Sequence, residues 1–77
     1  MQVEVILFGQ LTDITRQEKI LIADVADTDE LVKAIEQQYP GMASIKYVIA
    51  ADKKLISKNT VINEKTELAL LPPFSGG

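Results

Sequence analysis

The sequence of 77 residues is long enough for one small domain with a modest core, and it contains no cysteine and no histidine. This absence excludes a disulfide framework, a thiol nucleophile, an imidazole base and the usual zinc ligands, so we expect no metal site. The net charge of -3 and the scattered basic residues argue against nucleic acid as a partner. The apolar runs are far shorter than the roughly 20 residues of a membrane span, and the start lacks a signal-peptide pattern, which favours a cytoplasmic protein.

Two strands are predicted in the first part of the chain. Residues 3–8 alternate between two faces and are rich in β-branched side chains, which predicts a strand that Gly9 ends. Residues 10–17 are polar, with two apolar residues at helical spacing, and indicate a helical turn within a connection. Residues 18–23 are apolar and β-branched and predict a second strand.

An amphipathic helix follows, and its start is marked by Asp27 or Thr28 as the capping residue. Asp27 and Glu30 have the spacing of a capping box, and the acidic first turn suits the unpaired N–H groups of a helix N-terminus. Pro40-Gly41 ends the helix. The residues that repeat at helical spacing and form its apolar stripe are Leu31, Ala34, Ile35 and Tyr39.

The remaining chain predicts three further strands. They are residues 46–51, a short strand at 55–56 after a turn at 52–54, and residues 67–71 after a turn at 63–65. The order is therefore strand, strand, helix, strand, short strand, strand. This order indicates an α+β fold in which one helix covers one face of a mixed sheet. We expect a domain over residues 1–71 and an extended tail over residues 72–77.

Strand alternation divides the predicted sheet into two faces. One face carries Val3, Val5, Leu7, Leu68 and Leu70 and should face the helix. The opposite face carries Glu4 and Glu67, and also four apolar residues: Ile6, Phe8, Ala69 and Leu71. These four are either isolated surface apolar residues, which are common, or a patch that binds a partner protein. We prefer the second interpretation.

The tail from Pro72 to Gly77 has no packing periodicity. Two prolines stiffen its base and two final glycines remove side-chain bulk, so it can enter a narrow channel in another protein. The alternative is an ordinary frayed terminus. A C-terminal carboxylate is ionised and a poor electrophile, so it must be activated, for instance as an acyl-adenylate made with ATP. Because the chain has no cysteine, any sulfur that it carries must be attached to this carboxylate.

The tail strongly resembles the C-terminal signature of the MoaD-like sulfur carriers, the small subunits of molybdopterin synthase. The resemblance rests on Leu70-Leu71-Pro72-Pro73-Phe74-Ser75-Gly76-Gly77, and Phe8-Gly9-Gln10-Leu11 is also similar to that family. It implies the ubiquitin-like β-grasp fold. It also implies that Gly77, preceded by Gly76, forms the adenylate and the thiocarboxylate.

The same resemblance implies the partners. An adenylating enzyme related to ubiquitin activators would use ATP to activate Gly77, and the tail would then insert into the large synthase subunit, in a heterotetramer. There the sulfur would pass to a cyclic pterin precursor of molybdopterin. The partner contacts would be Ile6 and Phe8 together with Leu71, Pro72, Pro73, Phe74 and Ser75. The large subunit supplies the catalytic side chains in that family, so this chain would not be an enzyme on its own and would hold no permanent cofactor. Phe74 is bulkier than the valine often found there.

Other functions use the same features. The sulfur carrier of thiamine thiazole synthesis shares the fold, the adenylation and the Gly-Gly end, but it usually lacks the Leu-Pro-Pro lead-in. A ubiquitin-like modifier would attach the same tail to lysines, and a pure binding module would not use it at all. The acidic residues near the start of the helix are better explained by capping and the helix dipole than by catalysis.

Overall fold

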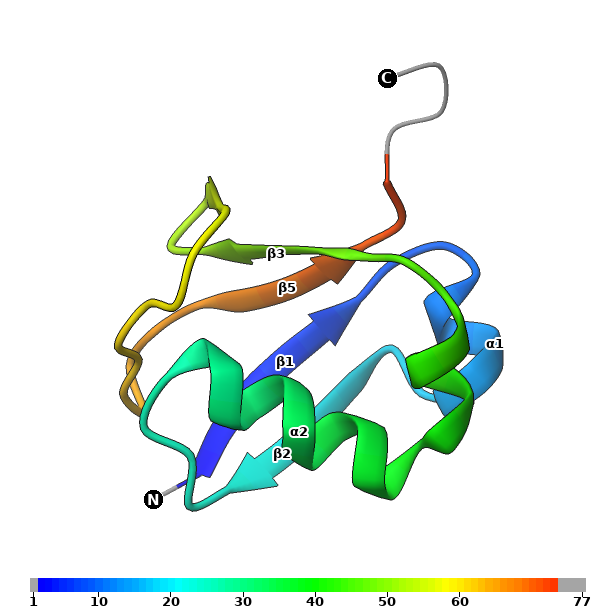
Figure 1. The fold of residues 1–77 in the computed structure, drawn as a ribbon, viewed down its shortest axis with the longest axis horizontal. Helices are drawn as coiled ribbons and strands as arrows, with labels where there is room; N and C mark the ends of the chain where they lie inside the picture. The colour runs from blue at the N-terminus through cyan, green and yellow to red at the C-terminus, as the bar shows by residue number, and fades with distance from the viewer. Residues whose placement is uncertain (1, 74–77) are drawn as a thin grey trace.

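The computed structural model describes residues 2–73. A five-stranded mixed sheet, in the order β2-β1-β5-β3-β4, forms the centre of the fold. The neighbouring strands β1 and β5 are parallel, the other pairs are antiparallel, and α2 crosses one face of the sheet (Figure 1). The elements are β1 (Gln2–Leu7), α1 (Leu11–Thr15), β2 (Lys19–Ala23), α2 (Thr28–Gln38), the 3-10 helix η1 (Pro40–Ser44), β3 (Val48–Ala51), β4 (Lys54–Ile56) and β5 (Leu68–Leu71). The predicted α+β architecture and its element order are confirmed.

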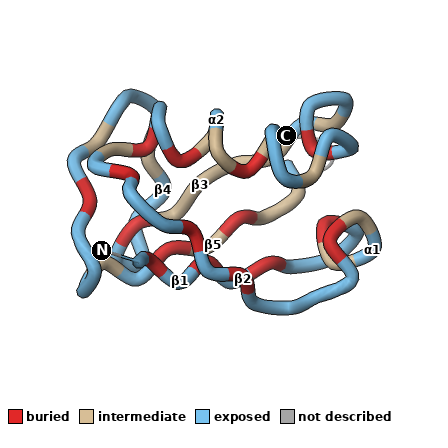
Figure 2. Tube along the Cα trace, turned by 90° about the horizontal axis from the view of Figure 1, so that it is seen from below, coloured by how far each residue is buried: buried red, intermediate tan, exposed pale blue. Residues whose placement is uncertain are grey.

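The core lies between α2 and the inner face of the sheet. Buried and exposed residues alternate along β1 and β2, as Figure 2 shows along the Cα trace. This alternation confirms the predicted assignment of the faces, because the strand residues expected to face the helix are all buried. The buried strand residues with the lowest exposure are Val3, Val5, Ile22, Leu68 and Leu70, and α2 contributes Leu31 and Ile35.

Asp27 is the residue that caps α2. Its Oδ1 accepts a hydrogen bond of 2.9 Å from the N–H of Glu30. The reciprocal bond differs from the predicted capping box, because Glu30 Oε1 accepts from the N–H of Ala26 at 2.8 Å and not from that of Asp27. The side chain of Glu30 therefore satisfies a donor one residue further from the helix.

A distant loop completes the same helix end. Asn59 Oδ1 accepts from the N–H of Asp29 at 2.9 Å and from Thr28 Oγ1 at 3.3 Å. The N–H of Thr28 donates to the carbonyl of Thr60 at 2.9 Å. A helix cannot satisfy its first N–H groups internally, and those of Thr28 and Asp29 thus have partners from the loop before β5.

All five strands differ from their predicted bounds by one or two residues at an end, and for β3 and β4 the cause is visible in the structure. β3 begins at Val48 and not at residue 46, because the chain leaves α2 through η1, which no pattern indicated and which buries Met42. β4 begins at Lys54, which was expected in the turn. Asp52 and Lys53 both have positive φ, 51° and 71°, and form a two-residue turn, so Lys54 already pairs with Ala51.

Within residues 2–73, no helix is long and apolar enough to cross a lipid bilayer.

Candidate partner surface and base of the tail

The sheet face opposite α2, here called the outer face, carries a row of residues that crosses all five strands. The registers pair Lys19 with Ile6, Ile6 with Ala69, Ala69 with Ala50, and Ala50 with Leu55. Four of these five residues are apolar, and Ile6 and Leu55 are 42% and 58% exposed. The outer face therefore presents an apolar band that no described element covers.

Phe8 and Leu71 lie at one end of this band. They directly follow the paired residues Leu7 and Leu70 of the parallel strands, and the N–H of Phe8 donates to the carbonyl of Leu70 at 3.1 Å. Phe8 is 47% exposed, while Leu71 is half-buried and pairs with Val48. The structure therefore brings the predicted contacts Ile6, Phe8 and Leu71 to one face of the sheet. Their role in binding stays a prediction.

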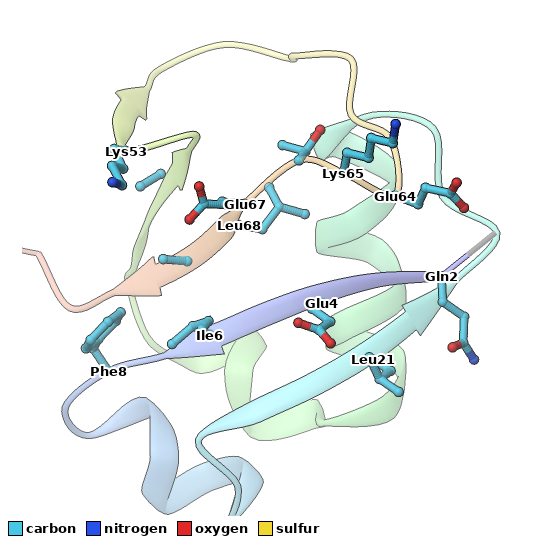
Figure 3. Close-up of a pocket in the computed structure, with 13 residues that line it drawn as sticks. Gln2, Glu4, Ile6, Phe8, Leu21, Lys53, Glu64, Lys65, Glu67 and Leu68 are labelled. Carbon is cyan, nitrogen blue, oxygen red and sulfur yellow. The ribbon is translucent and has the colours of Figure 1, made fainter.

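A groove of about 610 Å³ runs along the outer face. Figure 3 shows Phe8 at the end where β5 also leaves the sheet, and Glu64 and Lys65 at the opposite end. Its apolar lining includes Ile6, Phe8, Leu21, Ala50 and Ala69, and its charged lining consists of Glu4, Lys53, Glu64, Lys65 and Glu67. An apolar floor with a charged margin has the composition of a protein-binding surface.

Leu21 and the charged margin were not among the predicted site residues. The alternation along β2 could have indicated Leu21, because its neighbours Ile20 and Ile22 are buried on the inner face and Leu21 is 51% exposed. Its place beside Glu4 follows only from the register of β1 with β2. The ion pair between Glu4 and Lys19, at 3.9 Å, joins two exposed side chains, so it contributes little to stability.

The base of the tail rests on Gly9. Gly9 has φ of +60°, and a Cβ at this position would lie 2.8 Å from Cγ of Pro72. Carbon atoms pack best at about 3.5–4.0 Å, so the ring of Pro72 occupies space that only glycine leaves open. Pro72 is half-buried and Pro73 exposed. The remaining predicted tail residues, Phe74, Ser75, Gly76 and Gly77, lie outside the described residues.

Among residues 2–73, one titratable group has a strongly shifted pKa, and it lies between α2 and the segment before β3. Burial raises the pKa of Tyr47 to about 12, and the nearby negative charge of Glu36 acts in the same direction. Tyr47 Oη donates a hydrogen bond of 3.2 Å to Glu36 Oε2. This contact ties the segment before β3 to the helix, so it explains the shift by a structural role.

The described residues contain no group of three acidic, histidine or cysteine side chains placed to hold a metal ion. What they provide is a groove along the outer face and a fixed starting point for the tail, which lies at the end of the sheet where Phe8 lines the groove.

A mixed sheet with parallel central strands and one main helix on its inner face defines the ubiquitin-like β-grasp class. The small archaeal modifier protein 1 of Methanosarcina acetivorans shares this fold, with a TM-score of 0.84, 18% identity and coverage of 99% of this chain and 96% of that chain. A chain in the complex of subunits 1 and 2 of the molybdopterin-converting factor from Helicobacter pylori has a TM-score of 0.70 and 33% identity, with both chains fully covered.

Sequence comparison identifies the family. The model of the ThiS family matches residues 5–77. The human molybdopterin synthase sulfur carrier subunit is 33% identical over 88 residues, which cover 99% of this chain and 94% of the human protein. The chain therefore belongs to the MoaD/ThiS family of ubiquitin-like sulfur carriers, and the predicted family and fold are confirmed.

Proposed function

We propose that this chain is the sulfur-carrying small subunit of a molybdopterin synthase and that Gly77 carries the sulfur. The observation that carries the proposal is the full-length similarity to molybdopterin synthase sulfur carrier subunits, combined with the Leu-Pro-Pro-Phe-Ser-Gly-Gly end of the sequence. The absence of cysteine supports it, because it leaves the terminal carboxylate as the place for sulfur.

The chemistry needs two steps at Gly77 before any transfer. The carboxylate attacks the α-phosphate of ATP in the active site of an adenylating enzyme, and pyrophosphate leaves. A sulfur nucleophile then attacks the acyl carbon and displaces AMP, which leaves a thiocarboxylate. In the large subunit the thiocarboxylate sulfur would attack a carbon of a cyclic pterin precursor and displace an oxygen substituent from it, which gives a thioester. Attack of water on the glycyl carbonyl then breaks the bond between this carbonyl and the sulfur, which leaves the sulfur on the pterin and restores the carboxylate.

Docking and reaction are assigned to different parts of the chain in this proposal. The outer face binds the large subunit through Ile6, Phe8 and Leu71, and the segment from Pro72 to Ser75 leads the two glycines into its active site. Phe8 lies at the end of the groove from which the tail leaves, so one partner can contact both parts.

Intact-mass spectrometry tests the proposal. Incubation with the adenylating enzyme, ATP and sulfide should raise the mass by the exchange of one oxygen for one sulfur, and omission of ATP should prevent the change. A variant without Gly77 and a variant with one alanine appended after it should stay unmodified. A sulfur gain in the appended variant would exclude the carboxylate of Gly77 as the carrier, because in that variant it is part of a peptide bond.

The molecule that accepts the sulfur or the acyl group distinguishes the proposed function from the related ones. The ThiS family model does not by itself distinguish carriers for molybdopterin from carriers for thiazole synthesis. We expect the thiocarboxylated chain to convert the cyclic pterin precursor when it is mixed with the large subunit. Transfer to a thiazole synthase alone, or an isopeptide bond to lysine, would assign the chain to one of the alternatives.

A further inference from the structure

Gly9 is placed where the tail leaves the sheet, although 62 residues separate it from Pro72 in the sequence. The parallel pairing of β1 with β5 brings both strand ends to the same edge of the sheet (Figure 1). There the ring of Pro72 lies against the bare Cα of Gly9, so that a Cβ on Gly9 would be 2.8 Å from Cγ and 3.5 Å from Cδ of that ring.

The backbone of Gly9 is held from several directions. Its carbonyl accepts from the N–H of Thr12 at 3.1 Å and from Thr12 Oγ1 at 2.9 Å. Phe8, the residue before Gly9, is hydrogen-bonded to Leu70 of β5. Leu11, two residues after Gly9, is fully buried. A side chain at position 9 therefore cannot be accommodated by a shift of this turn without breaking bonds or moving the core.

Pro72 is also restricted. Its φ is fixed by the ring, and it follows Leu71, which pairs with Val48 in the sheet. An added Cβ on Gly9 would thus have to turn the chain at Pro72. Residues 73–77, if extended, reach about 17 Å, so a rotation of about 20° at their base would move their end by about 6 Å.

We propose that Gly9 is a positioning residue for sulfur transfer: with Pro72 it forms a tail seat that sets the direction in which the C-terminal residues leave the domain. The proposal rests on the proposed function, because it needs the tail to reach a narrow active site in a partner. A displacement of reacting atoms by about 1 Å can slow a reaction about a hundredfold.

Gly9→Ala tests the tail seat, and Gly9→Ala with Pro72→Ala is its matched partner. The single variant introduces the Cβ, and the double variant removes the ring carbons that the Cβ would meet. We expect Gly9→Ala to lower kcat for sulfur transfer in the assembled synthase by about tenfold or more, with KM changed less than about twofold. Pro72→Ala removes the other half of the seat and should also slow transfer. The double variant should be no slower than the slower single variant, because both changes act on one contact.

Control variants separate an effect on the direction of the tail from an effect on the stability of the fold. Alanine at φ of +60° is strained whatever its surroundings, so Gly9→Ala and the double variant should both show a fall in Tm, while Pro72→Ala should slow transfer without this strain. Gly9→Asn, which tolerates this backbone conformation better, repeats the test if Gly9→Ala does not fold. Gly41→Ala places a Cβ 3.1 Å from Ile14 Cγ2, a tight contact with another residue, and should leave the transfer rate unchanged.

The outcomes are distinct. A wild-type chain that gains no sulfur would refute the proposed function. A wild-type chain that transfers sulfur, together with a Gly9→Ala variant of full kcat or a double variant slowed by the product of the two single effects, would refute the tail seat. Nuclear Overhauser contacts between the Gly9 Hα atoms and the Pro72 ring in the free wild-type protein should be strong, and their absence would count against it independently of activity.

Discussion

At the scale of single residues, the most perturbed group described is Tyr47, and its contact with Glu36 is a local device for stability. When a half-buried phenol that donates to a carboxylate ionises, it loses this hydrogen bond, and its new charge is poorly solvated and repelled by the carboxylate. The pKa near 12 therefore means that the folded state retains the phenolic proton where the unfolded chain, with an ordinary value of 10.0, has begun to lose it.

The consequence is a loss of stability in alkali. The contribution of Tyr47 is complete below pH 10 and disappears as the pH rises toward 12. We expect Tyr47→Phe to lower the free energy of unfolding by about 1 kcal/mol at neutral pH and to make its fall between these pH values shallower. Tyr39→Phe removes the other tyrosine and should keep the steeper fall. Equal slopes in both variants, from urea unfolding at each pH, would contradict this account of Tyr47.

At the scale of elements, the sequence predicted what depends on local periodicity and missed what depends on distant pairing. The alternation of apolar residues predicted the buried face of β1 and β5, and the helical spacing predicted the apolar stripe of α2. The second cap of α2 could not be predicted, because Asn59 is 30 residues from Asp29 and only the path of the loop before β5 brings them together. The contact of Gly9 with Pro72 was missed for the same reason, since Gly9 looked like a simple strand terminator.

The remote cap of α2 has a measurable effect. We expect Asn59→Ala to lower the free energy of unfolding by about 1 kcal/mol, the usual loss when an N-terminal acceptor is removed. The amide of Asp29 should then exchange faster with solvent. Asn59→Asp keeps an acceptor and adds negative charge near the helix N-terminus, so it should retain the stability of the wild type. A stable Asn59→Ala variant with a slowly exchanging Asp29 amide would show that the loop does not cap the helix.

At the scale of the whole molecule, the two faces of one sheet have different roles. The inner face supplies the core, and the exposed apolar residues of the outer face add little to the stability of the free chain, because they remain in contact with water. Alternation predicted Ile6, Phe8 and Leu71 on the outer face. It could not predict that Leu21 in β2 and Leu55 in β4 lie on the same face at opposite edges of the sheet, because the strand order β2-β1-β5-β3-β4 is not encoded in any local pattern.

The outer face should therefore matter for association and little for folding. We expect Phe8→Ala to weaken binding to the large subunit by more than about 1 kcal/mol, roughly a fivefold rise in Kd or more, because a half-exposed aromatic at the end of a groove is a typical interface anchor. Leu71→Ala should act in the same direction. Val61→Ala is the matched control, since Val61 is 82% exposed and does not line the groove. Calorimetric titration of each variant, with circular dichroism to confirm the fold, measures the difference. If Phe8→Ala and Leu71→Ala both bind as tightly as Val61→Ala, the partner does not use the outer face.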